Sequence, residues 1–115
     1  MQMINLTQHI GTADQNVTEP ADKGAVQELL TFDSLPSSAE IQKRAEALAE
    51  IAKGYSTAMI GGAPYLMGPL EKALFEVGVA PYYAFSERVS VEVEVDGVIT
   101  KKTTFKHVGF VEVER

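Results

Sequence analysis

The sequence predicts a small α/β domain that ends in a long antiparallel β-hairpin. Three observations support this: strand-like and helix-like segments alternate as far as residue 85, valine and polar residues alternate over 89–95, and Asp96-Gly97 is a preferred two-residue hairpin turn. Together they predict a mixed sheet with about three parallel strands and about three helices. A chain of 115 residues fills one core, so we expect one domain over 1–115 with an arm over about 86–113.

The first strand and first helix are predicted from short signals. The run Met3–Thr7 is β-prone and ends in polar residues, as a buried first strand does. A polar loop follows, and Thr18 is a candidate N-cap for a helix whose first turn holds Glu19-Pro20. The apolar stripe of that helix consists of Val26, Leu29 and Leu30.

The middle of the chain has the strongest helix pattern. Ser37-Ser38-Ala39-Glu40 is a capping box, and Gly54 ends the helix. The apolar residues between them follow helical spacing: Ile41, Ala45, Leu48 and Ala52. A buried strand over 55–60 and another over 81–85 flank a further amphipathic helix. The start of that helix is left open, because Pro69 fits only a first turn or a kink.

The register of the hairpin follows from its turn. If Val95 opposes Val98, opposed residue numbers sum to 193, and Glu92 faces Lys101 as an opposite-charge pair. The same register predicts three further pairs: Arg88 with Phe105, Ser86 with His107, and Tyr83 with Phe110. A β-bulge near Gly109 would shift the pairs nearest the domain by one residue.

The carboxyl ends of the three parallel strands indicate a ligand site, because ligands of open α/β sheets bind beyond these ends. Glycine pairs before a helix let backbone amides approach an anion, and the helix N-terminus adds partial positive charge. The candidate catalytic residues are His9, Ser86 and His107. The candidate ligand-binding residues are Gln8, Gly61, Gly62, Ala63 and Arg88.

Each of these residues also has a structural interpretation. The glycine pair can simply form a tight turn between strand and helix, without binding a ligand. His9 can cap the turn that follows it, and Arg88 can pair with a neighbouring glutamate. Ser86 and His107 make a poor nucleophile–base pair, since no orienting carboxylate is evident from the spacing. Two histidines without a spaced carboxylate partner predict no metal site, and no cofactor is expected.

Composition narrows the function classes. The net charge of −6 argues against a protein that coats duplex nucleic acid, although it allows a compact anionic ligand at a local site. The absence of cysteine excludes disulfides, thiolate zinc sites and cysteine nucleophiles. Without a signal peptide or a membrane-length apolar run, the chain is expected to be cytoplasmic, with no membrane partner.

The arm predicts a protein partner. Val89, Val91, Val93 and Val95 make one of its faces apolar, and a two-stranded ribbon of this kind is marginally stable alone. Its cover is either the helices of the same chain or a second subunit. We expect a symmetric homodimer with interdigitated arms, since such dimers are the commonest oligomers.

The segment Ala58-Met59-Ile60-Gly61-Gly62-Ala63-Pro64-Tyr65-Leu66, followed by Leu70 and Leu74, resembles the CRISPR-associated Rossmann-like (CARF-like) sensor domains. The likeness covers the first strand and roughly Thr57 to Arg88, while the threonine and lysine that often follow the glycines are missing. The resemblance implies a Rossmann-like domain that dimerises and binds cyclic oligoadenylate. It also implies a role in antiviral defence, because stand-alone relatives, the ring nucleases, cleave this second messenger.

Three hypotheses remain open at this point. In the first, the protein is a metal-independent ring nuclease: the 2′-hydroxyl of the ligand attacks the adjacent phosphorus, while His9 or His107 moves the proton and Ser86 and Arg88 contact the phosphate. In the second, the same edge binds or sequesters a nucleotide without cleaving it. In the third, the chain is a small dimeric interaction protein and side chains fill the edge.

Overall fold

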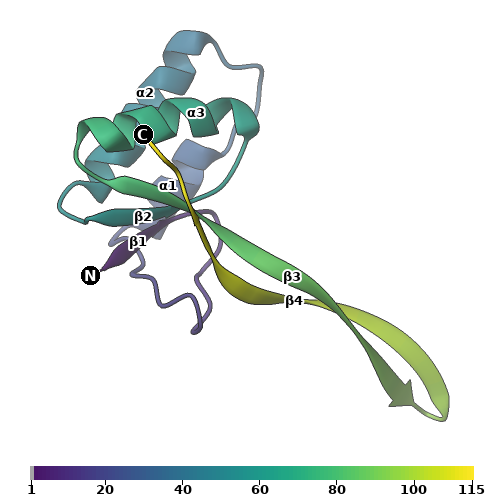
Figure 1. Ribbon diagram of the computed structural model, residues 1–115. Helices are drawn as coiled ribbons and strands as arrows, with labels where there is room; N and C mark the ends of the chain where they lie inside the picture. The colour runs from purple at the N-terminus through teal and green to yellow at the C-terminus, as the bar shows by residue number, and fades with distance from the viewer. Residues whose placement is uncertain (1) are drawn as a thin grey trace.

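The computed structural model describes residues 2–115 and contains one four-stranded sheet with three helices (Figure 1). In chain order the elements are β1 (Met3–Leu6), α1 (Lys23–Leu30), α2 (Ser38–Ala52), β2 (Thr57–Ile60), α3 (Pro64–Glu76), β3 (Ala80–Val95) and β4 (Val98–Glu112). The strand order is β1-β2-β3-β4; the first three strands are parallel, and β4 is antiparallel to β3. The predicted mixed α/β sheet is therefore confirmed.

All three helices lie on one side of the sheet, and the loop after β1 crosses the other side (Figure 1). This follows from the strand order, because successive right-handed crossovers in one direction put their helices on the same face. Alternate strand residues, including Leu6 and Ile60, form the core with Leu48 of α2 and Leu70 of α3. None of the helices between residues 2 and 115 is long and apolar enough to cross a membrane.

Helix α2 matches its sequence signature at both ends. The Ser37 side chain accepts a hydrogen bond from the Glu40 amide at 3.1 Å, as an N-cap does. The Glu40 carboxylate does not complete the expected box; it accepts from Arg44 Nε at 2.9 Å, one turn further on. Gly54, with φ of +101°, supplies the predicted left-handed end.

Helix α1 begins later than the sequence suggests, and the structure fixes the start of α3, which the sequence left open. Helix α1 starts at Lys23, and its N-cap is Asp22, whose side chain accepts from the Ala25 amide at 3.0 Å. Thr18 is not an N-cap, because its backbone forms a parallel bridge with Ile4 along the free edge of β1. Helix α3 starts at Pro64, and Pro69 lies inside it rather than in its first turn.

The hairpin register is confirmed from Val95↔Val98 to Ser86↔His107, including Glu92↔Lys101. The predicted pair of Tyr83 with Phe110 is wrong, because a register shift lies between Phe85 and Ser86. Phe85 pairs with Gly109, so Val108 is the extra residue of the bulge and Tyr83 pairs with Val111. The bulge occurs one residue before the position that the sequence suggested.

The hairpin extends from the sheet as a free arm (Figure 1). The radius of gyration is 16.7 Å and the longest dimension is 55 Å, whereas a compact domain of this length has a radius of gyration of about 13 Å. Val93 and Val95 are 37% and 56% exposed. The helices of the same chain therefore do not cover the valine residues of the arm.

Candidate functional site

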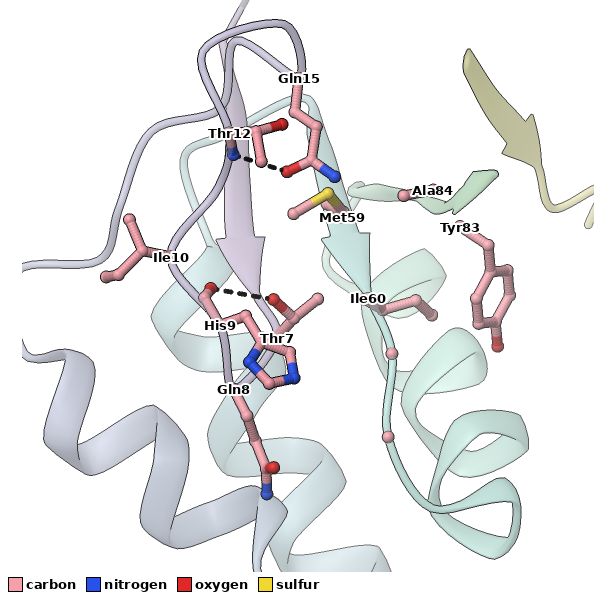
Figure 2. Close-up of a pocket in the computed structure, with 12 residues that line it drawn as sticks. Thr7, Gln8, His9, Ile10, Thr12, Gln15, Met59, Ile60, Tyr83 and Ala84 are labelled. Atoms are coloured by element: carbon pink, nitrogen blue, oxygen red, sulfur yellow. Dashed lines mark hydrogen bonds between the residues drawn. The ribbon is translucent and has the colours of Figure 1, made fainter. Parts of the chain in front are cut away.

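A pocket of about 450 Å³ lies beyond the carboxyl ends of β1 and β2 and beside Tyr83 and Ala84, where β3 stops pairing with β2, at the edge that the topology predicts. Figure 2 shows the loop after β1 on one side of this pocket, and the end of β2 with Tyr83 and Ala84 of β3 on the other. The lining residues are Thr7, Gln8, His9, Ile10, Thr12, Gln15, Met59, Ile60, Gly61, Gly62, Tyr83 and Ala84. The edge is hollow rather than filled by side chains.

Four of the predicted site residues line this pocket together: Gln8, His9, Gly61 and Gly62. Gln8 and His9 are exposed and follow β1 directly, and the glycines follow β2. Ala63, the fifth residue from the strand ends, is the N-cap of α3 and does not line the pocket. Ala63 makes no side-chain capping bond, so no side chain occupies the amides at the start of that helix.

The three predicted residues of the arm do not line the pocket. Ser86 and His107 are cross-strand neighbours, as predicted, but they lie beyond the bulge, where the arm leaves the sheet. The Arg88 guanidinium lies 6.0 Å from the centre of the Phe105 ring, its register partner. Of the three candidate catalytic residues, only His9 therefore lines the pocket.

His107 has a packing role at the root of the arm. Its ring meets the Phe110 ring edge to face at 4.9 Å, and Phe110 in turn lies 6.4 Å from Tyr82. Thr12 donates a hydrogen bond to Asp14 and lowers the pKa of that carboxyl, and the nearby His107 lowers it further. His107 thus borders the loop that covers the open face of the sheet, outside the pocket itself.

A polar network under the loop was not predicted. Asn5, fully buried in β1, donates from Nδ2 to the His9 carbonyl at 2.7 Å and to the Glu19 carboxylate at 3.0 Å, and its Oδ1 accepts from the Thr7 amide at 2.9 Å. Lys23 Nζ donates to the Thr7 and His9 carbonyls at 2.7 and 3.0 Å and pairs with Glu19 at 3.2 Å. This network fixes the backbone that presents Gln8 and His9.

Glu19 is the charged centre of the network. Burial alone would raise its pKa, but hydrogen bonds from Asn5, the Gly11 amide and Lys23 outweigh burial and lower it. The carboxylate therefore stays ionised and holds the loop at three points. The signal in the sequence was Asn5 itself, a polar residue at the centre of an otherwise apolar strand.

The glycine turn shapes the floor of the pocket. A Cβ added at Gly61 would lie 3.6 Å from Thr7 Cγ2, so a larger side chain there would extend across the gap between β1 and β2. Gly62 has φ of +153°, and a Cβ there would approach Met67 Cε at 3.4 Å. Gly61 therefore keeps the floor open, while Gly62 serves the backbone turn into α3.

The wall formed by β3 has no group that titrates near neutral pH. Burial, together with a 2.6 Å hydrogen bond from the Tyr83 hydroxyl to Glu71 of α3, raises the pKa of Tyr83. Among the lining residues within the described chain, His9 is the only one with an imidazole side chain. Residues 2–115 contain no cluster of three or more His, Cys, Asp or Glu that could hold a metal ion.

Comparison with known proteins identifies the family of the chain but indicates no activity. Residues 1–111 match the model of the uncharacterized protein MJ1673 family, and the chain belongs to this family. No curated protein and no solved structure matches the chain significantly.

Proposed function

We propose that the protein is a small-molecule binding module that holds one phosphate-bearing nucleotide unit in the pocket at the ends of β1, β2 and β3. The observation that carries this proposal is the open pocket, which combines the exposed His9 and Gln8 with the glycine turn before α3. Its volume, about 450 Å³, lies in the range of small-ligand sites. An edge filled by side chains would leave no pocket here.

The chemistry of the lining favours a single phosphate over a highly charged ligand. Within residues 2–115, no Lys, Arg, Asp or Glu side chain lines the pocket. Backbone amides of the glycine turn and the partial positive charge at the start of α3 would therefore hold the phosphate. His9, when protonated, would add a charge-assisted hydrogen bond from the opposite side.

Cyclic oligoadenylate is the ligand that the sequence resemblance suggests, and in this proposal one of its nucleotide units occupies the pocket. In this proposal the fold is a reduced Rossmann-like unit. The protein acts in the cytoplasm of a cell whose type III CRISPR defence makes the messenger, and it senses or sequesters that messenger.

Cleavage is the second candidate, and His9 is the observation that favours it. In that reaction the 2′-hydroxyl oxygen bonds to phosphorus, the bond from phosphorus to the 5′-oxygen breaks, and a cyclic phosphate remains. His9 would accept the proton of the 2′-hydroxyl, and water would protonate the leaving 5′-oxygen, since Ser86 and His107 lie outside the pocket. Because His9 would act as a general base without a general acid to protonate the leaving oxygen, we expect slow turnover at most.

The two histidines of the chain provide the test. Calorimetric titration with cyclic tetra-adenylate, cyclic hexa-adenylate and 5′-AMP should give binding that His9→Ala weakens at least about tenfold, the usual loss for a hydrogen bond to a charged group. His107→Ala is the matched control and should change the affinity less than threefold. Mass spectrometry of the same mixtures, without added metal, detects any cleavage.

Two outcomes would overturn the proposal. If none of the three ligands binds at millimolar concentration, the pocket is not a nucleotide site. If His107→Ala removes binding while His9→Ala leaves it intact, the ligand binds at the root of the arm and the pocket has been misassigned. Turnover that depends on His9 would establish the nuclease in place of the binding module.

A further inference from the structure

The two faces of the arm differ in character, and the register defines each of them. One face, here called the valine face, carries Glu87, Val89, Val91, Val93 and Val95 of β3 opposite Lys106, Thr104, Lys102, Thr100 and Val98 of β4. The other, here called the outer face, carries Ser86, Arg88, Ser90, Glu92 and Glu94 opposite His107, Phe105, Thr103, Lys101 and Ile99. The valine face is the more apolar of the two, yet Val91 is 42% and Val98 is 62% exposed.

We propose that a second copy of this chain covers the valine face, and that the two arms lie parallel about a two-fold axis that runs along them. This inference does not depend on the ligand of the pocket. It rests on the exposure of the valine face and on the way charge is distributed over the two strands of the arm.

The two strands of the arm carry opposite charge. Residues 86–95 of β3 hold three glutamates and one arginine, whereas residues 98–107 of β4 hold three lysines and no acidic residue. On the valine face itself the charged residues are Glu87 of β3 and Lys102 and Lys106 of β4. A two-fold axis along the arm places each acidic strand over the basic strand of the partner. A two-fold axis across the arm would instead place acidic strand over acidic strand and basic over basic, which like-charge repulsion disfavours.

The individual positions on the valine face lead to the same arrangement. With parallel arms, Glu87 faces the partner's Lys106, while Lys102 faces the partner's Val91 and its aliphatic stem can cover that side chain. With antiparallel arms, Lys102 would face its own copy at the centre of the contact. Parallel arms therefore form two ion pairs and avoid a buried pair of like charges.

The size of the contact suits a reversible dimer. Ten rows of residues along a strand span about 33 Å, and two strands are about 10 Å wide. Such a face, with its side chains, buries roughly 500 Å² on each copy, which is at the lower limit of specific interfaces. We therefore expect a dimer that forms at micromolar concentration, and not a permanent one.

The first experiment measures oligomeric state by size exclusion with light scattering. The full chain should be dimeric at tens of micromolar, and Val91→Glu with Val93→Glu should be monomeric, because charge enters the desolvated face. Ser90→Glu with Thr103→Glu adds the same charge to the outer face and should remain dimeric. A monomeric wild-type chain, or equal loss of dimer in both variants, would overturn the proposal.

The second experiment determines the orientation of the two arms with spin labels. Because the chain has no native cysteine, each label attaches only to the introduced cysteine. Spin labels on Ile99→Cys lie near the arm tip on the outer face. Parallel arms should keep them about 25 Å apart across the two ribbons, whereas antiparallel arms centred on Lys102 add about 20 Å along the arm and separate them by about 32 Å. Labels on Thr103→Cys, at mid-arm on the same face, should give similar distances in either arrangement and serve as the control. A long tip-to-tip distance contradicts the parallel arrangement.

The third experiment separates contacts between chains from contacts within a chain. Glu87→Lys and Lys106→Glu each break the pair inside one arm and also place like charges across the parallel interface. Each variant alone should dimerise about tenfold more weakly, as expected for two ion pairs turned repulsive. A mixture of the two restores only the pairs between chains, so recovery of dimer on mixing supports parallel arms. No recovery refutes them.

Discussion

Replacing Asn5 with alanine should destabilise the protein more than any other single change at the pocket edge. The side chain is fully buried. It donates hydrogen bonds to the Glu19 carboxylate at 3.0 Å and to the His9 carbonyl at 2.7 Å, and it accepts them from the Thr7 amide at 2.9 Å and the Thr7 hydroxyl at 2.6 Å. A bond to a charged group contributes about 1.5–3 kcal/mol and each neutral bond about 1 kcal/mol. Because Glu19 is half-exposed, water can replace part of the hydrogen bonding that the Asn5 side chain provides. We therefore expect Asn5→Ala to lower the free energy of unfolding by about 3 kcal/mol.

Thermal unfolding followed by circular dichroism tests this magnitude. For a domain of this length, about 3 kcal/mol lowers Tm by roughly 12 °C. Gln27→Ala is the matched control, since the exposed Gln27 amide makes one 3.0 Å bond to the same loop, at the Gln8 carbonyl, and it should cost less than about 0.5 kcal/mol. A Tm loss for Asn5→Ala no larger than that of the control would refute the account of the loop as held by this network.

Acidification should destabilise the protein, because hydrogen bonds lower the pKa of Glu19 in the folded state. The stability that these bonds contribute is complete above the ordinary glutamate pKa and is lost as pH falls through the lowered pKa of the folded state. Tm measured from pH 7 to 3 should therefore fall more steeply for wild type than for Glu19→Gln. Arg88→Ala should leave nucleotide affinity within about twofold, because Arg88 lies outside the pocket; a tenfold loss in calorimetry would show that the arm reaches the ligand. Gly62→Ala should lower the free energy of unfolding in urea by about 1–2 kcal/mol, because Gly62 has φ of +153°. Gly61→Ala should lower it by less than about 0.5 kcal/mol. Equal losses in the two variants would contradict the assigned turn geometry.

Most of the fold could be predicted because its signals are local. Ser37 and Gly54 mark the ends of α2, and Asp96-Gly97 fixes the register of the arm as far as the bulge. The start of α1 was mispredicted for a non-local reason. The backbone of Thr18 pairs with the edge of β1, and its capping potential is unused because this pairing keeps the residue extended.

The sequence predicted the part of the candidate site at the ends of β1 and β2, but it misplaced the residues of the arm. The ends of β1 and β2 meet by topology alone, which brought His9 next to Gly61-Gly62. The direction in which the arm leaves the sheet depends on the bulge at Val108, and this direction removes Ser86 and His107 from the pocket. A register gives pairing between strands but not the path of a ribbon in space, so the sequence could not separate the two groups.

The pocket and the arm adjoin one another near Ala84 of β3, yet their proposed roles can be tested apart. The residues that line the pocket lie within 7–15, 59–62 and 83–84, and none of them lies between Phe85 and Val108. A monomeric variant with Val91→Glu and Val93→Glu should therefore bind a nucleotide with the affinity of wild type. If that variant loses binding while its Tm is unchanged, the pocket of one chain is incomplete and the parallel arms, which bring both pockets to the same end of the dimer, contribute to the ligand site.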